Sequence, residues 1–313
     1  MNVIAIVAHS RPECLHIHLE QLLKNKELPD YLVYFFLDFG YHPDTLKVIK
    51  WFKQQHKHIR IKMQTETDSK TCQLSAFYNI FDAYRTAVKF ADEFVIPGEE
   101  DIIPTEDYLR YNKAVYDNFL SKYDKIFCVG TKRRQLNDME GDPELLIGDI
   151  QLCQPTCISN KVINKLIIPL MDMPNFWIPP LFNQTTWPQS RNNPDHHIHH
   201  DGQLERMAEC NNMFCLKPDH ARSGHIGVGG QHFNGKVEGN TLYEKVRYMK
   251  SLMYSTDKLK DASENKRDMC CVPKTLEWTD LRLDLERTLV KTQSADFDPD
   301  NKFAAYIKTE LSK

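Results

Sequence analysis

Three adjacent carboxylates stand directly after an apolar segment. Glu99, Glu100 and Asp101 follow the apolar residues 94–97 and a glycine. Carboxylates this close repel one another, so burial without a partner would raise their pKa values. A divalent cation such as Mg²⁺ or Mn²⁺ removes that cost, because these metals bind one or two carboxylates together with substrate phosphates. The alternative is a solvated turn at the start of a helix, whose dipole favours acidic side chains.

A second polar cluster is rich in histidine. Residues 196–201 read His-His-Ile-His-His-Asp and end at Asp201. Imidazole and carboxylate groups can ligate a transition metal, as they do in phosphohydrolases. The same residues could instead contact an acceptor or a donor, or form a solvated loop. The residue types alone leave all three interpretations open.

Basic residues follow a later apolar segment. Lys132, Arg133 and Arg134 come just after residues 125–130. Three cations at the rim of an active site could bind the phosphates of an anionic acceptor. A solvated loop is the alternative. A second basic stretch, within residues 53–62, is interpreted as ordinary surface.

Strands and helices alternate through the first half of the chain. Mainly apolar runs predict strands at residues 3–8, 31–37, 93–97 and 125–130, and alternation of apolar and polar residues predicts one at 59–63. Helical spacing of apolar residues predicts helices at residues 13–24, 42–52, 73–90 and 104–120. This alternation predicts an α/β fold with a mostly parallel sheet flanked by helices. Ligands of such sheets bind outside the carboxyl ends of the strands, where Arg11, Asp38, the acidic triplet and the basic run are expected.

The second half is less regular. Residues 174–200 are rich in Pro, Asn and His without periodicity, which is typical of a long functional or mobile loop. Short strands are predicted at residues 214–216 and 225–228. From about residue 236 the pattern becomes polar and charged. The predicted organisation is therefore a catalytic domain at residues 1–235 and a helical C-terminal appendage at 236–313.

Composition narrows the class of protein. The chain has 313 residues, of which 41% are hydrophobic and 27% charged, as in ordinary globular proteins. The net charge of −3 excludes a broad basic face of the kind that histones carry. Nine cysteines without a paired CxxC pattern favour free thiols in a reducing compartment over a zinc site. With no signal peptide or membrane-spanning run in the sequence, we expect a cytoplasmic protein, in the host cytoplasm if it is viral.

Residues 94–111 resemble a stretch of a known family. They read Phe-Val-Ile-Pro-Gly-Glu-Glu-Asp-Ile-Ile-Pro-Thr-Glu-Asp-Tyr-Leu-Arg-Tyr. This is similar to the strand, acidic triplet and helix start of the inverting N-acetylglucosaminyltransferases that begin complex N-glycan branches and extend O-mannose glycans. The family has the GT-A fold, and the third carboxylate of its Glu-Asp-Asp triplet ligates Mn²⁺. The resemblance therefore implies a GT-A fold, metal binding by Asp101, and a nucleotide-sugar site that includes Glu99 and Glu100.

Further motifs follow in the same order, over about residues 1–230. The first strand precedes His-Ser-Arg-Pro, which looks like the family's strand and its diphosphate-contacting arginine, here Arg11. Leu-Asp-Phe-Gly is similar to the family's Gln-Asp-Cys-Gly, which assigns Asp38 to the uridine pocket. Residues 215–227 resemble Cys-Ile-x-Pro-Glu/Asp-x-Ser-Arg-x-x-His-Phe-Gly, which places His225 near the metal and diphosphate. Weaker matches are found at residues 78–87 and 142–146.

The catalytic base of the family does not match directly. The family carries it in Phe-Trp-Asp-Asp-Trp, but here Phe176 and Trp177 are followed by Ile178. The resemblance is continued after an insertion by aligning Asp201 with the base and Arg206 with the arginine that follows it. Glu205 is the second candidate. A carboxylate in this role accepts the proton of the acceptor hydroxyl as the new bond forms.

The resulting hypothesis is a metal-dependent inverting glycosyltransferase. Its donor would be a nucleotide-sugar, with UDP inherited from the resemblance, and its metal Mn²⁺ or Mg²⁺. The acceptor could be a hydroxymethyl pyrimidine in DNA, as for phage-type DNA glycosyltransferases. Such an enzyme would have to flip the target base out of the duplex. A glycan or small hydroxylated molecule is the alternative acceptor. Two other classes remain, namely a metal-dependent phosphohydrolase built on the histidine cluster and the acidic triplet, and a non-catalytic nucleotide-binding module.

Overall fold

The computed structural model describes most of the first 130 residues and separate segments of the rest. The described residues are 1–71, 75–131, 144–147, 156–179, 181–182, 200–211, 213–217, 221–226 and 237–253. The predicted acceptor residues Lys132, Arg133 and Arg134 lie outside them, as do four residues of the histidine cluster and residues 254–313.

Eight strands of the described part of the chain form one mixed sheet. Their order across the sheet is β3 (Ile59–Met63), β2 (Tyr31–Leu37), β1 (Asn2–Ala8), β4 (Phe94–Glu99), β8 (Thr156–Ser159), β6 (Ile126–Gly130), β9 (Phe214–Lys217) and β7 (Glu144–Ile147). The first four are mutually parallel, and β6 is parallel to β9. Strand β8 runs antiparallel to both β4 and β6, and β7 runs antiparallel to β9. The predicted α/β class with a mostly parallel sheet is confirmed.

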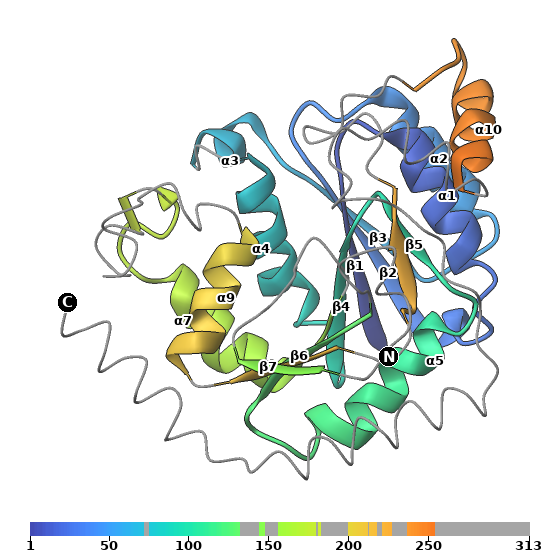
Figure 1. Cartoon of the computed structure of the whole chain (residues 1–313). Coiled ribbons are helices and arrows are strands. Elements are labelled where there is room, and N and C mark those ends of the chain that lie inside the picture. Colours follow the sequence, from blue (N-terminus) through green and yellow to red (C-terminus); the bar gives the residue numbers. More distant parts are fainter. Residues whose placement is uncertain are drawn as a thin grey trace.

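Helices cover both faces of this sheet (Figure 1). Every residue of β1 and β2 is buried, as expected for parallel strands covered on both sides. Successive side chains of a strand point to opposite faces. Val3, Ala5 and Val7 therefore pack in the core beneath α4 (Ser75–Ala87). The alternate residues of β1 pack with α1 (Pro12–Leu22) on the other face.

The remaining helices follow from local sequence signals. Both α1 and α2 (Pro43–Lys53) begin with a proline, whose fixed φ suits the first helical turn. Helix α10 (Leu242–Met253), inside the predicted appendage, packs against α1, and Lys250 pairs with Glu20 of α1. Among the helices that the structure describes, none is long and apolar enough to cross a membrane.

The strand order reverses between β1 and β4. From β1 the chain moves through β2 to β3 on one side, and then returns to place β4 on the other side of β1. In open α/β sheets, ligands bind at the carboxyl ends of the strands beside such a reversal. The residues that follow β1 and β4 are therefore the first candidates for a binding site.

One predicted helix is wrong in its first turn. Residues 102–104 form strand β5 (Ile102–Pro104), and α5 (Tyr108–Val115) begins only at Tyr108. Strand β5 pairs antiparallel with β10 (Ser223–His225) as a separate two-stranded ribbon. A strand was predicted at residues 225–228, whereas the observed strand β10 begins two residues earlier, at Ser223, and ends at His225. Both errors have one cause, because a pairing across more than 100 residues leaves no local periodicity.

Several elements of the second half were missed. Strands β7 and β8 were not predicted, nor was the helical segment made of α6 (Asn160–Val162), η4 (Ile163–Ile167) and α7 (Ile168–Met171). Helix α9 (His200–Cys210) begins at the last residue of the predicted 174–200 loop.

Candidate functional site

Three segments distant in sequence meet at the carboxyl ends of β1 and β4. They are the residues between β1 and α1, the turn between β4 and β5, and the end of β10. The first contributes Arg11, the second Asp101 and the third His225. The structure thus brings together three residues that the sequence assigned to a diphosphate and metal site.

Arg11 bridges two carboxylates of the acidic triplet. Its Nε donates to Glu100 Oε1 over 2.9 Å, and its Nη1 donates to Asp101 Oδ2 over 2.5 Å. The backbone N–H of His9 donates to the other oxygen of Glu100 over 2.7 Å. Burial lowers the pKa of Arg11, but the negative charges of Asp101 and Glu100 outweigh burial and raise this pKa well above its ordinary value. Arg11 is therefore a permanent cation at this position.

Asp101 is almost completely buried, with 1% of its surface exposed, and Glu100 is 3% exposed. Asp101 Oδ2 also lies 3.0 Å from His225 Nε2, and the Asp101 carbonyl accepts the Ile226 N–H over 2.7 Å. Burial raises the pKa of Asp101, but Arg11 and His225 outweigh it and hold this pKa far below its ordinary value. The alternative of a solvated turn at a helix start is therefore wrong for these two carboxylates.

The other oxygen of Asp101 is available for a further ligand. Within the described part of the chain, Asp101 Oδ1 and His225 Nδ1 are buried and make no hydrogen bond. Such orphaned atoms are rare in folded proteins and often mark a site for an ion or a ligand. No group of three or more His, Cys, Asp or Glu that could hold a metal occurs among the described residues. Asp101 and His225 therefore suit a metal ion that takes few protein ligands and completes its coordination shell with phosphate oxygens and water.

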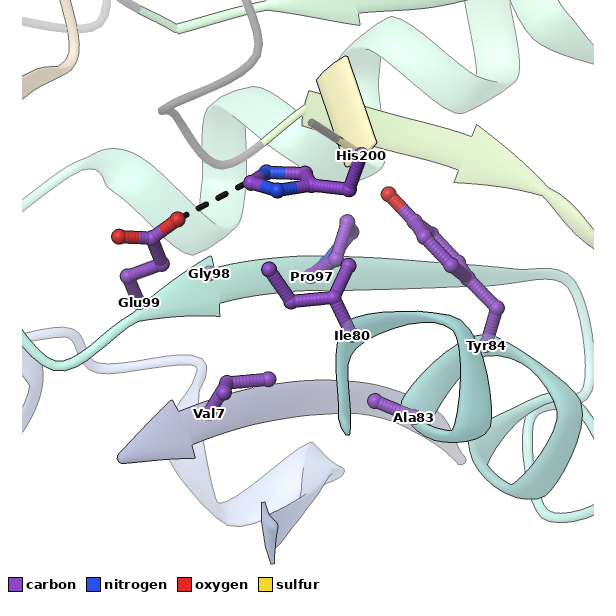
Figure 2. A pocket seen from close by; sticks show the side chains of 8 residues that line it. All are labelled: Val7, Ile80, Ala83, Tyr84, Pro97, Gly98, Glu99 and His200. Atoms are coloured by element: carbon purple, nitrogen blue, oxygen red, sulfur yellow. Dashed lines mark ion pairs between the residues drawn. The ribbon is translucent and has the colours of Figure 1, made fainter. Parts of the chain in front are cut away.

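Glu99 faces a small pocket rather than Arg11 (Figure 2). Its Oε1 lies 3.7 Å from Nε2 of His200, the first residue of α9. The pocket has a volume of about 20 Å³, enough for a water molecule. It is lined by Val7, Ile80, Ala83, Tyr84, Pro97, Gly98, Glu99 and His200. Burial, and then the charge of Asp101, raise the pKa of Glu99 to about 7.

Asp38 lies one strand further along, directly after β2. Its N–H donates to the Ala8 carbonyl over 3.1 Å, and its Oδ1 accepts a hydrogen bond from Asn79 Nδ2. Burial raises the pKa of Asp38 to about 7, although the Asn79 hydrogen bond lowers it in part. The turn that follows needs Gly40, whose φ is +79°.

The predicted catalytic base lies at the start of α9. Asp201 is half-buried, and its Oδ1 accepts the N–H of Gly202 over 2.8 Å. Because the neighbouring His200 contacts Glu99, this end of α9 is close to the end of β4. Arg206, further along the same helix, pairs with Glu209 over 2.6 Å.

Two buried groups around the site escaped the sequence analysis. His18 of α1 is 4% exposed and lies beside the backbone of Glu99. Arg222 is completely buried and pairs with Asp107. A signal for His18 was present, since Arg11, Cys14 and His18 recur at the spacing of one helical face. Arg222 stands in the 215–227 motif, but nothing local indicates its burial.

Comparisons with known proteins give only distant likenesses. No protein-family model matches the sequence. Residues 1–349 of S. aureus TarS, solved in complex with UDP-GlcNAc, share 14% identity with a TM-score of 0.45, over 100% of this chain and 78% of that one. Mannosyltransferase PcManGT from Pyrobaculum calidifontis, in complex with GDP-Man and Mn²⁺, shares 16% identity with a TM-score of 0.32, over 42% of this chain. The matches span 35% of the PcManGT chain and 29% of the longer TarS chain.

Proposed function

We propose that this protein is a metal-dependent inverting glycosyltransferase of the GT-A type that uses a nucleotide-sugar donor. One observation carries the proposal. Arg11 and His225 both contact Asp101 where the strand order reverses, and Asp101 keeps one buried oxygen without a hydrogen-bond partner in the described structure. A cationic arginine, a carboxylate and an imidazole at this place suit a diphosphate and the cation that accompanies it.

Each residue of this group has a distinct part in the proposal. Asp101, with His225, would hold Mn²⁺ or Mg²⁺, and the ion would supply positive charge to the departing diphosphate. Arg11 would bind the diphosphate oxygens through the N–H groups that now reach Glu100 and Asp101. Glu100 then keeps Arg11 in place while Asp101 is engaged elsewhere.

The remaining residues surround the donor and the acceptor. Asp38, at the end of β2, would bind the nucleoside, which we take to be uridine. Glu99 lines the pocket beside the metal-binding residue. Asp201 would accept the proton of the acceptor hydroxyl, as its place at the start of α9 next to the Glu99–His200 contact supports. Arg206 belongs to the same helix and is proposed to contact the acceptor.

The acceptor is proposed to be a hydroxymethyl pyrimidine in DNA, with a glycan or small hydroxylated molecule as the alternative. The DNA proposal is supported by the sequence Lys132, Arg133 and Arg134, which follows Thr131 directly. The Thr131 carbonyl accepts the backbone N–H groups of Arg222 and Ser223, so the chain passes within three residues of His225 at this point. Cations that contact phosphates would make binding depend steeply on salt.

The decisive experiment measures nucleotide release from a panel of nucleotide-sugars. The protein would be assayed with Mn²⁺ or with a chelator, and with or without hydroxymethylated DNA. We expect metal-dependent release that Asp101→Asn reduces by at least about a hundredfold, because charge stabilisation of the leaving group is lost. Asp117→Asn is the matched control, since it removes an exposed carboxylate paired with Lys113.

The outcomes separate the functional classes. Release that DNA stimulates, and that Asp201→Asn blocks without weakening donor binding, supports the DNA glycosyltransferase. Release indifferent to DNA but stimulated by a glycan or small alcohol moves the acceptor to the alternative. Release that no acceptor stimulates, and that His200→Gln abolishes, supports a phosphohydrolase. Binding of nucleotide without turnover of any donor leaves a binding module and contradicts the proposal.

A further inference from the structure

A second buried ion pair lies at the opposite end of the β5–β10 ribbon from Asp101. Arg222 Nε is 3.2 Å from Asp107 Oδ2, and the two side chains are 0% and 1% exposed. This is a close contact of opposite charges without hydrogen-bond geometry, since neither of these two atoms makes a hydrogen bond within the described part of the chain. The guanidinium carbon of Arg222 lies 5.0 Å from the centre of the Tyr111 ring. Full burial of an arginine carries a large desolvation cost, which the attraction to its partner offsets only in part. We therefore look for a structural role of this pair other than net stabilisation of the fold.

The Asp107 carboxylate lies against Arg222 and does not cap its own helix. It occupies the N-cap position of α5, where an aspartate ordinarily accepts an N–H of the first turn. It makes no such bond. Its other oxygen, Oδ1, instead accepts the Thr105 hydroxyl over 2.5 Å. The carboxylate is therefore held towards Arg222 and the ribbon.

The backbone on both sides of Arg222 is fixed as well. Its N–H donates to the Thr131 carbonyl over 2.5 Å, and its carbonyl accepts the Thr105 N–H over 3.0 Å. The Ser223 N–H also donates to the Thr131 carbonyl, and the hydroxyls of Ser223 and Thr131 are 2.8 Å apart. Arg222 thus lies at a junction between β6, β5 and β10.

From this junction a short strand leads directly to the site. Ser223, Gly224 and His225 pair with Pro104, Ile103 and Ile102. The strand ends where Ile226 donates to the Asp101 carbonyl. Three residues of extended chain span about 10 Å. A shift of one residue in this register would carry the His225 imidazole to the other face of the ribbon, away from Asp101.

The strand itself has little with which to fix its register. Register is ordinarily set by the pattern of side chains that one face buries. Strand β10 offers only a serine, a glycine and a histidine for this purpose. Beyond the contacts of Ser223 with Thr131, a further anchor is therefore needed, and Arg222 is the residue that precedes the three paired residues.

We infer that Arg222 is a positioning residue: paired with Asp107, it fixes the register of β10 on β5 and so places His225 against Asp101. The inference rests on the proposed function for what His225 does in catalysis. The placement of His225 by Arg222 and Asp107 does not depend on the proposed function.

The test measures the accessibility of His225, which requires no substrate. Native protein would be treated with diethyl pyrocarbonate at neutral pH, and the modification rate of each histidine followed by peptide mass spectrometry. In Asp107→Asn we expect His225 to react about tenfold faster than in the wild type, because the ribbon opens locally. His18, which is buried beside Glu99, is the internal control and keeps its slow rate.

Two further variants make the result decisive. Arg222→Lys keeps the charge but not the planar fork, and it should accelerate His225 modification less than Asp107→Asn does. Asp117→Asn, which breaks an exposed pair near the end of the same helix, should change neither histidine. The inference is overturned if His225 keeps its wild-type rate in both Arg222→Lys and Asp107→Asn while His18 stays protected. It is equally overturned if His18 and His225 accelerate together in both variants, which would show general loosening.

A turnover arm separates this inference from the proposed function. If the wild type releases nucleotide, Arg222→Lys should lower kcat more than it raises KM for the donor, and the effect should vanish in the His225→Ala background. If no donor is turned over, the proposed function fails. The modification rates still decide the place of His225.

Discussion

Arg11 helps to keep the buried carboxylate of Asp101 ionised. It contacts both Glu100 and Asp101, and its own side chain is only 18% exposed. Carboxylates in such surroundings would otherwise take up protons or draw in water. The cation therefore preserves in the free protein the charge on Asp101 that a metal and a diphosphate would require.

Arg11→Met should consequently unfold the protein at lower denaturant concentration. Removing one partner of a buried ion pair typically costs about 3–5 kcal/mol, because the remaining charge loses its compensation. Urea unfolding would measure this loss. The control is Arg85→Met, which breaks the exposed pair with Asp172 and should cost no more than about 1 kcal/mol. Equal losses in both variants would contradict the role assigned to Arg11.

Helix α1 supports the site along one face. Arg11 immediately precedes the helix, and Cys14 and His18 follow on the same side. Cys14 Sγ lies 3.5 Å from the Ile226 carbonyl, and His18 contacts the Glu99 backbone. One helix therefore touches the acidic turn and the end of β10 together.

His18 makes this helix sensitive to acid. Burial lowers the pKa of His18 from 6.5 to about 4, although the Glu99 backbone and Asp101 partly oppose this shift. The folded state thus favours the neutral ring. Its contribution to stability is present above about pH 6.5 and is lost as the pH falls to about 4. In His18→Gln, the loss of unfolding free energy between these pH values should be smaller by about 3 kcal/mol.

Chemical denaturation at a series of pH values would test this. Exposed Lys89 provides the control, since Lys89→Gln changes a surface side chain away from His18 and should retain the wild-type pH dependence. A His18→Gln curve parallel to the wild type would show that the ring titrates normally in the folded protein.

Elements with strong local signals were predictable from the sequence. Strands β1 and β2 are continuous apolar runs, and α1, α2 and α4 have regular apolar spacing, so their positions were correct to within a few residues. The carboxyl-end rule then gathered Arg11, Asp38 and the triplet. Nothing local marks β5 or β10, because their three-residue pairing is specified by tertiary contacts. The Arg222–Asp107 pair was invisible for the same reason.

At the scale of the whole molecule, the donor and metal should stabilise the fold together. The site joins α1, the β4–β5 turn and β10, so a ligand bound there opposes unfolding of all three. At donor concentrations a hundredfold above Kd, the gain is about 2.7 kcal/mol. We expect Tm to rise with a nucleotide diphosphate and Mn²⁺ together, and the rise to disappear on chelation or in Asp101→Asn. A shift that survives both treatments would place the nucleotide elsewhere.

The contacts of the site also span very different lengths of chain. Arg11 and Asp101 are 90 positions apart, whereas Cys14 and Ile226 are 212 apart. During synthesis the first pair can form long before the second, because the chain leaves the ribosome from its N-terminus. Closing the longer loop has the larger entropic cost, and it comes last. A nascent chain therefore holds Asp101 against Arg11 first, and gains the imidazole that completes the group only when β10 arrives.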